Sequence, residues 1–243
     1  MIRFKERSDE VELMDDLTLD QSRIKPVLAD INKANKLLGG NRITLMAVER
    51  LTQKFPRKLY RIVDMGCGDG SMLREVAAFC DGLGIKVELT GIDLNEKSLQ
   101  IARHKSKSYS NISYLQGDIL DLNAQDLHCD ILLCTLTLHH FHEKEIEIFI
   151  TKFAELARIG VVVNDLERNK IAYQLFKIFA AVFMKTEIAR KDGLTSIRSG
   201  FLKKDLIAYS ELLPDMKHHI SSRWAFRYEW SFWHPQNIEN ERC

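Results

Sequence analysis

The segment DMGCGDGS at residues 64–71 places three glycines and two aspartates within eight positions. Glycines at this spacing let the backbone turn sharply and let another molecule lie close against it. The segment follows a short β-branched run, LYRIVDM, and precedes a helical stretch, SMLREVAAFC. A strand, a glycine-rich turn and a helix in this order predict a cradle for part of a nucleotide at the carboxyl end of a parallel sheet.

The residues that follow alternate between short apolar runs and amphipathic runs. Strands are expected at KVELTGIDL, ISYLQGD, CDILLCTLTL and IGVVVNDL, with helices at EKSLQIARHKS and EKEIEIFITKFAELA. Such alternation predicts βαβ units and a doubly wound, Rossmann-like α/β fold. The C-terminal MKHHISSRWAFRYEWSFW is aromatic and partly alternating, and it predicts two antiparallel strands that close one edge of the sheet.

The flanking segments complete a single predicted domain. Residues 1–58 are expected to form a helical cap, residues 59–166 the cofactor-binding core, and residues 167–243 the substrate-side helices and closing strands. In the first part, Gly39 and Gly40 permit a close approach, and Arg42 is a candidate partner for a carboxylate. In the last part we expect an apolar helix near 168–185, a glycine-bearing connector near 190–200 and a helix near 203–212. The apolar helix is expected to be buried on most sides, or to form an aromatic wall of an acceptor pocket, or both. A third alternative is that it leans on a membrane to reach a lipid-soluble acceptor.

Acidic residues in and after the glycine turn distinguish between two cofactors. The turn reads Gly-x-Gly-x-Gly, with Ser71 where a dinucleotide motif would need its last glycine. Asp64 and Asp69 would each repel a nearby pyrophosphate by about 1–4 kcal/mol. The same carboxylates suit a cofactor that carries an ammonium and a sulfonium group. The charges therefore favour S-adenosylmethionine (SAM) over a nicotinamide dinucleotide.

Four segments together resemble the cofactor motifs of class I SAM-dependent methyltransferases, in order and in spacing. They are VDMGCGDGS, LTGIDLNEKSLQIAR, ISYLQGDIL and CDILLCTLTLHHF, and they span roughly residues 60–165. The LHHF ending resembles small-molecule methyltransferases of the ubiquinone/menaquinone kind. The segments ELMDD, NKLLGG, VVVNDLERN and RKDGLTSIRSGF also resemble a bacterial group associated with polyketide and other aromatic products.

This resemblance implies a seven-stranded, mostly parallel sheet with the last strand pair reversed and helices on both faces. It implies that Gly66, Gly68 and Gly70 approach the methionine part of SAM and that Asp93 binds the ribose. The rest of the implied cofactor-binding set consists of Asp118 and Ile119 beside the adenine, Cys134 and Thr135 under the sulfonium, and Asp64, Cys67 and Leu94.

Candidate catalytic residues follow the fourth and fifth strands. His139 and His140 stand where the methyl group should point, and a histidine can take the proton of a phenol or hydroxyl near neutral pH. Alternatively, one of them packs or caps the helix that begins near Glu143. Asp165 either orients a histidine or caps the following helix. The segment RKDGLTSIRSGF is either a substrate lid or a solvated loop.

Other features bear on partners and location. The net charge is +1 and there is no block of lysine and arginine, so no nucleic-acid partner is expected. Five cysteines without a CxxC pair predict reduced thiols, a cytoplasmic location and no metal site. The N-terminus has no apolar core of a secretory signal. The stretch IAYQLFKIFAAVFM is too short for stable membrane insertion. The oligomeric state cannot be read, although the aromatic C-terminal edge would allow a homodimer.

These observations predict a methyltransferase that acts on a small-molecule acceptor, at an oxygen of an aromatic or polyketide-like compound. Three alternatives remain open. An RNA or protein methyltransferase is disfavoured by the near-neutral charge and by TLTLHH, which replaces an Asn-Pro-Pro-Tyr type of motif. A non-catalytic SAM-binding module that acts through a partner is not excluded by intact motifs. A nicotinamide dehydrogenase is disfavoured by the charges of the loop.

Overall fold

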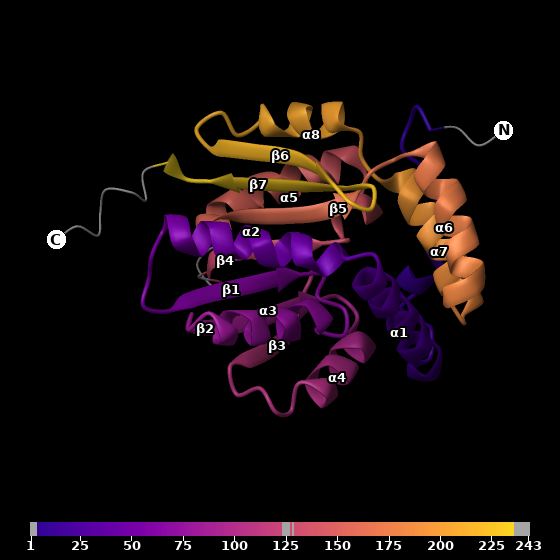
Figure 1. The fold of residues 1–243 in the computed structure, drawn as a ribbon, viewed down its shortest axis with the longest axis horizontal. Coiled ribbons are helices and arrows are strands. Elements are labelled where there is room, and N and C mark those ends of the chain that lie inside the picture. The colour runs from indigo at the N-terminus through magenta and orange to yellow at the C-terminus, as the bar shows by residue number, and fades with distance from the viewer. Residues whose placement is uncertain (1–3, 123–126, 128, 236–243) are drawn as a thin grey trace.

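The computed structural model describes residues 4–122, 127 and 129–235, and it is built around one seven-stranded sheet (Figure 1). The strand order is β3-β2-β1-β4-β5-β7-β6. Strands β1 to β5 pair in parallel, whereas β7 is antiparallel to both β5 and β6. The predicted fold class is therefore confirmed. The strands are β1 (Tyr60–Met65), β2 (Val87–Asp93), β3 (Ile112–Gln116), β4 (Cys129–Thr135), β5 (Ala157–Leu166), β6 (Lys217–Arg223) and β7 (Arg227–Trp233).

Helices connect the strands and extend beyond their carboxyl ends. They are η1 (Leu13–Asp15), α1 (Gln21–Leu37), α2 (Gly40–Lys54), α3 (Ser71–Gly82), α4 (Glu96–Lys105), η2 (Leu138–His140), α5 (Glu143–Leu156), α6 (Lys170–Phe183), α7 (Glu187–Ser199) and α8 (Lys203–Ser210).

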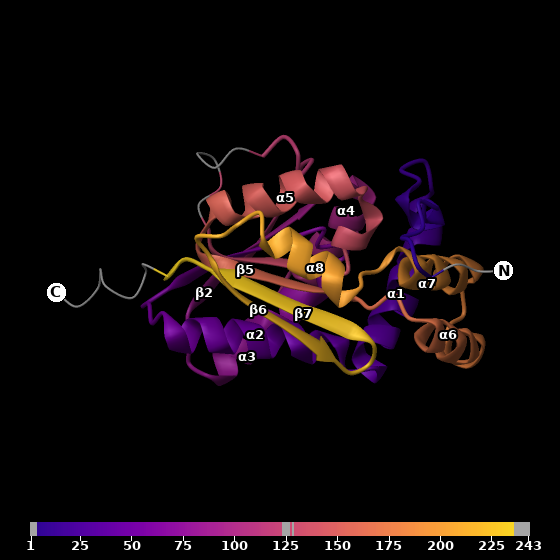
Figure 2. The same ribbon diagram turned by 90° about the horizontal axis from the view of Figure 1, so that it is seen from above.

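Both faces of the sheet are covered by apolar helix faces, as Figure 2 shows from a second direction. Side chains of α2, α3 and α4, including Val48, Leu73 and Leu99, form the core on one face. Phe149 of α5 and Leu206 of α8 belong to the core on the other face. Because β4 lies between these two layers, its first six residues are all buried. This double cover explains why its sequence is uniformly apolar instead of alternating.

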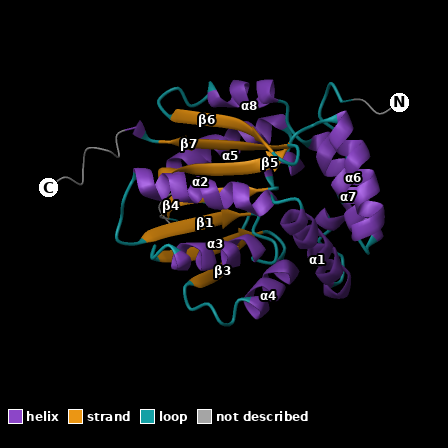
Figure 3. Ribbon diagram, in the orientation of Figure 1, coloured by secondary structure: helices purple, strands orange, loops and turns teal. Residues whose placement is uncertain are grey.

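Three helices, α1, α6 and α7, lie beyond the carboxyl ends of the parallel strands (Figures 1 and 3). Asp30 of α1 joins them. Its carboxylate accepts hydrogen bonds from the backbone N–H groups of Lys185 and Thr186 at 2.8 and 2.7 Å, and from the Thr186 hydroxyl at 2.8 Å. The joint between α6 and α7 is thereby fixed against α1, and the three helices surround the edge of the sheet where ligands bind in this class of fold.

The prediction of a connector near residues 190–200 is wrong, because this segment forms most of α7. The Thr186 hydroxyl caps the helix by accepting from the backbone N–H of Ala189. Gly193 lies inside the helix, and a Cβ atom there would overlap the ring of Phe176. This glycine allows α6 and α7 to pack closely, so it does not mark a loop.

The expectation that the apolar helix is buried on most sides is also wrong. Among the residues of α6, only Ala172 and Ala180 are buried. Ile171, Ile178 and Val182 are 63%, 67% and 70% exposed and leave one apolar face open. The other face packs against α7, which supports the alternative of an aromatic pocket wall. Neither α6 nor any other described helix has the length and hydrophobicity needed to cross a membrane.

Candidate active site

The loop between β1 and α3 has a backbone that only glycine adopts easily. Gly66, Gly68 and Gly70 have φ angles of 71°, 54° and 71°. A Cβ atom on Gly66 would overlap the side chain of Thr137, and one on Gly70 would overlap the hydroxyl of Tyr114. Conformation and space therefore both require glycine at these two positions.

Asp93 at the end of β2 holds this loop in place. One carboxylate oxygen accepts from the backbone N–H of Gly68 at 2.8 Å, and the other accepts from Asn95 at 2.8 Å. The side chains predicted to accompany it occupy different environments: Leu94 is half exposed, whereas Ile119 is buried. Asp118 follows the neighbouring strand β3, and its carboxylate accepts from the backbone N–H of Leu120 at 2.8 Å.

Asp64 at the end of β1 carries an unsatisfied carboxylate oxygen. The side chain is 2% exposed, and its Oδ1 atom has no hydrogen-bond partner among the described residues. Burial, together with the nearby charge of Asp93, raises the pKa of Asp64 to about 8. A buried, unpaired carboxylate beside a glycine loop suits a bound ammonium group, such as the one SAM carries.

The second loop acid, Asp69, behaves differently from the sequence expectation. It forms ion pairs with Lys105 and Arg74, and it accepts a hydrogen bond from Asn32 at 2.9 Å. Its charge is therefore already balanced within the protein. Of the two acids in this loop, Asp64 is the one whose carboxyl has an unsatisfied oxygen within the described residues.

We predict that Asp64→Asn stabilises the ligand-free protein at pH 8–9 and weakens binding of S-adenosylhomocysteine (SAH). An acid with a raised folded-state pKa binds its proton more tightly when folded. Its contribution to stability is therefore lost as pH rises from about 4 through 8. The neutral amide removes that loss, worth about 1–3 kcal/mol at alkaline pH. Thermal unfolding of both proteins from pH 6 to 9 measures it; an equal fall of melting temperature with pH in both would contradict the assignment.

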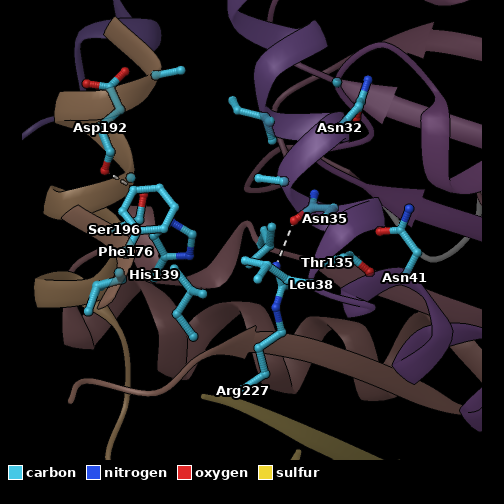
Figure 4. Close-up of a pocket in the computed structure, with 18 of the residues that line it drawn as sticks. Asn32, Asn35, Leu38, Asn41, Thr135, His139, Phe176, Asp192, Ser196 and Arg227 are labelled. Atoms are coloured by element: carbon cyan, nitrogen blue, oxygen red, sulfur yellow. Dashed lines mark hydrogen bonds between the residues drawn. The ribbon is translucent and has the colours of Figure 1, made fainter. Parts of the chain in front are cut away.

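A cavity of about 390 Å³ lies beside the loop, between the sheet edge and helices α1, α6 and α7. Figure 4 shows Phe176, His139 and Ser196 on one side of it, and Asn35, Thr135 and Arg227 on another. Of the predicted cofactor residues, the cavity is lined by Asp64, Gly66, Cys67, Gly68 and Thr135. Its apolar walls come mainly from Leu28, Ile31, Leu175, Phe176, Phe179 and Met184. Cys134 does not line the cavity; it is fully buried in the core.

His139 and Asp165 form a buried pair at the carboxyl ends of β4 and β5. Their side chains are 3% and 1% exposed, and His139 Nδ1 lies 2.6 Å from Asp165 Oδ1. The His139 backbone N–H also donates to Asp165 at 3.2 Å. Asp165 is therefore placed to orient a histidine and does not cap α6; Asn169 supplies that cap. Burial lowers the pKa of His139, but the charge and hydrogen bond of Asp165, with Glu12, outweigh it and raise the pKa to about 10.

The N-terminal segment brings two acids to these histidines that sequence reasoning missed. Glu12 lies 3.4 Å from His139 Nε2 and 3.9 Å from His140 Nε2. Asp15 lies 2.9 Å from His140 Nδ1. Arg7 anchors the segment by donating to the backbone oxygens of His139 and Phe141, both at 3.0 Å. The segment ELMDD, which contains both acids, resembled other proteins, but it gave no sign of these contacts because they join distant parts of the chain.

Arg227 is a further cavity residue that the sequence did not indicate. It is 4% exposed and donates to Asn35 Oδ1 at 2.7 Å, while its Nη1 has no partner among the described residues. Burial lowers its pKa to about 10. A Cβ atom on Gly40 would meet this guanidinium at 2.7 Å. The close approach predicted for Gly40 therefore involves Arg227, whereas Arg42 is exposed.

The cysteines provide no metal or disulfide site among the described residues. Cys67, Cys80, Cys129 and Cys134 are free, buried thiols. Cys243 lies outside the described part of the chain. Burial raises the pKa of the Cys80 and Cys129 thiols to about 11 and 12. These groups are therefore neutral near pH 7 and pack as small apolar side chains.

Comparison with known proteins identifies the core of the chain. Residues 62–160 match the family described as a methyltransferase domain. A putative methyltransferase, YqeM, from Bacillus subtilis is 32% identical over 54% of this chain and 49% of its own length. The ubiquinone biosynthesis O-methyltransferase of Nitrosospira multiformis is 29% identical over 53% of this chain and 52% of its own. A demethylmenaquinone methyltransferase of Staphylococcus aureus is 26% identical over 53% of this chain and 52% of its own length. The chain thus spans about half the length of these relatives.

Solved structures show the same fold over more of the chain. The plantazolicin methyltransferase BpumL in complex with SAH has a TM-score of 0.64 at 13% identity, and the match covers 91% of this chain and 97% of that one. The magnesium protoporphyrin IX methyltransferase of Synechocystis, with bound SAH, has a TM-score of 0.55 at 17% identity, covering 80% and 84%. The resemblance of the four cofactor motifs to class I SAM-dependent methyltransferases is confirmed for the core of the chain, whereas the resemblance to a bacterial group associated with polyketide products stays a prediction.

Proposed function

We propose that this chain, whose core is a class I SAM-dependent methyltransferase domain, transfers a methyl group to an oxygen of an aromatic or polyketide-like small molecule. The observation that carries the proposal is the buried His139–Asp165 pair, which lies on an apolar cavity that also reaches the glycine loop. SAM supplies an electrophilic methyl group on its sulfonium. The protein mainly has to place the acceptor oxygen in line with that group and exclude water.

The donor side of the proposal uses the residues around the glycine loop. Asp93 accepts the ribose hydroxyls, and the unpaired oxygen of Asp64 accepts the ammonium group. Arg227 offers its free Nη1 to a carboxylate, which the methionine part of the donor carries. The remaining proposed contacts are the backbone of Gly66, Gly68 and Gly70 with Cys67 to the methionine part, Asp118, Ile119 and Leu94 to the adenosine, and Thr135 below the sulfonium. Cys134 is buried in the core and is not proposed as a contact.

The acceptor side is formed by the aromatic face of α6 and by the two histidines. Phe176 and Phe179 offer flat apolar surface to an aromatic ring. With Nδ1 turned to Asp165, the Nε2 atom of His139 is the one left for the acceptor oxygen. Glu12 lies opposite this atom in the ligand-free protein, and together with Asp165 it keeps the ring protonated near pH 7. His139 can act as a base only where the acceptor or another ligand replaces Glu12 at its Nε2 atom. His140 lies beside His139 and lines the same cavity.

Features of the site bear on the alternatives. The cavity is lined mainly by apolar side chains from three helices, which favours a small acceptor over RNA or a protein surface. A nearby ammonium group would favour ionisation of the buried Asp64 carboxyl, whereas the diphosphate of a nicotinamide cofactor would oppose it. A cytoplasmic location and a homodimer through the edge strand β6 stay predictions from the sequence.

The test is a pair of binding experiments followed by a methyl-transfer screen. Calorimetry should show SAH binding with a dissociation constant below about 100 μM, and no binding of NAD at 1 mM. Incubation with methyl-labelled SAM and a panel of phenols and hydroxyquinones should then transfer label to at least one ring hydroxyl. If SAH fails to bind, the proposal that this chain is a SAM-dependent methyltransferase is contradicted. If it binds while label reaches only protein or RNA, the small-molecule acceptor is wrong.

A further inference from the structure

The side chains of Glu12, His139 and His140 converge on one point at the cavity wall. One ligating atom from each lies within 4.8 Å of the other two. The glutamate comes from the N-terminal segment and the histidines from η2, so the cluster exists only in the folded chain. All three residues line the main cavity and also a smaller one beside it.

The distances within the cluster match metal coordination better than hydrogen bonding. His139 Nε2 lies 3.4 Å from Glu12 Oε1, and His140 Nε2 lies 3.9 Å from Glu12 Oε2. Two ligands at about 2.1 Å from a tetrahedral ion stand about 3.4 Å apart. His139 Nε2 is buried and makes no hydrogen bond to the described residues. Its near neighbour is Glu12 at 3.4 Å, so this buried nitrogen points into the cluster at a distance longer than a normal hydrogen bond.

A carboxylate lies beside the Nδ1 atom of each imidazole ring, as is common for histidines that bind metals in proteins. Asp165 lies 2.6 Å from His139 Nδ1, and Asp15 lies 2.9 Å from His140 Nδ1. Each carboxylate accepts the Nδ1 proton, so Nε2 faces the cluster and becomes the ligating atom when its own proton is released to solvent on metal binding. Ser196 donates to Glu12 Oε1 from α7 and fixes the third ligand.

The charges around the cluster leave room for a cation. Glu12, Asp15 and Asp165 form ion pairs only with the two histidines, and no lysine or arginine within the described residues pairs with any of them. Three carboxylates around two imidazoles carry an excess of negative charge, which a divalent ion balances. Mixed imidazole and carboxylate donors suit zinc, cobalt, nickel or iron better than magnesium or calcium.

We propose that Glu12, His139 and His140 bind one divalent transition-metal ion at the wall of the acceptor cavity. The sequence prediction of no metal rested on the cysteines, which take no part in this cluster. Two imidazoles and one carboxylate leave at least one coordination position open. The role of this position in the reaction rests on the proposed function. The open position takes the acceptor oxygen, and the ion stabilises the ionised form of the acceptor hydroxyl. His139 then acts on the acceptor through the ion.

The test uses the full chain, freed of metal with a chelator and dialysed. Titration with Co²⁺, followed by visible absorption, and with Zn²⁺, followed by calorimetry, should each show one ion per chain with a dissociation constant below about 10 μM. Glu12→Gln and His140→Gln should each weaken binding at least tenfold. The matched control is His142→Gln, because this neighbouring side chain is 69% exposed and lies outside the cluster.

The outcomes separate this proposal from the proposed function. Absence of Co²⁺ binding at 1 mM, or equal weakening in His142→Gln, overturns the metal site. SAH binding is measured on the same samples and should persist in Glu12→Gln, so loss of the metal site leaves the donor site testable. Addition of catechol to the cobalt-loaded protein should change the spectrum. An unchanged spectrum overturns the open position that faces the acceptor.

Discussion

Replacing His139 by glutamine should lower kcat at least 100-fold on any acceptor that the wild-type protein methylates, while the affinity for SAH stays within threefold. A positioned side chain that binds or deprotonates the reacting group contributes roughly 10²–10⁴ in rate. Glutamine keeps an N–H that can donate to Asp165, so it avoids leaving a buried carboxylate unpaired. Steady-state kinetics with labelled SAM and SAH calorimetry measure the two effects.

Two further variants show whether this loss belongs to the histidine–carboxylate pair. Asp165→Asn should reduce kcat in the same direction, because an amide no longer fixes the ring with an anionic acceptor. His142→Gln, on the surface three positions further along, should have wild-type kcat. Unchanged turnover in His139→Gln, with the melting temperature preserved, would remove this residue from the reaction.

Asp93→Ala should weaken SAH binding at least tenfold while the protein stays folded. The carboxylate is the proposed acceptor for two ribose hydroxyls, and hydrogen bonds to charged groups contribute about 1.5–3 kcal/mol each. The substitution also removes the acceptor for the Gly68 N–H, which helps to hold the glycine loop. Asp93→Asn keeps one acceptor oxygen and should therefore fall between the wild type and the alanine variant.

A control on the same strand isolates the effect of position. Glu88 also lies on β2, is 56% exposed and pairs with Arg61 at the surface. Glu88→Ala should bind SAH like the wild type. Wild-type affinity in Asp93→Ala would place the ribose elsewhere and would undermine the reading of the glycine loop as a donor site.

The part of the fold that sequence predicted well is the part fixed by local pattern. Buried strands between two helical layers read as apolar runs, and CDILLCT is buried at six of seven positions in β4. The glycine loop could also be predicted from the sequence, because the positive φ angles at Gly66, Gly68 and Gly70 favour glycine over other residue types. Orienting a histidine was one of the alternatives that the sequence left open for Asp165, because the carboxyl ends of neighbouring parallel strands meet at one sheet edge. The structure brings Asp165 to His139.

The parts that sequence missed depend on contacts between distant segments. Glu12 reaches His139 across 127 positions. The segment ELMDD resembled other proteins, but nothing in it indicated that Glu12 would face a histidine. Gly193 suggested a loop, yet it serves the close packing of α7 against Phe176. The apolar composition of α6 suggested burial. At the rim of the sheet, however, the neighbouring helices cover only one side of α6, and its other side is exposed.

The proposed donor and acceptor contacts come mainly from different stretches of the polypeptide. The glycine loop, Asp93 and Asp118 all lie within residues 62–160, the span shared with the methyltransferase domain family. Most of the apolar cavity wall, with Glu12 and Arg227, comes from before or after that span. Grafting foreign flanks that keep Asp165 and Arg227 onto this middle portion should therefore change which compound is methylated, while the sulfonium reagent is held as before.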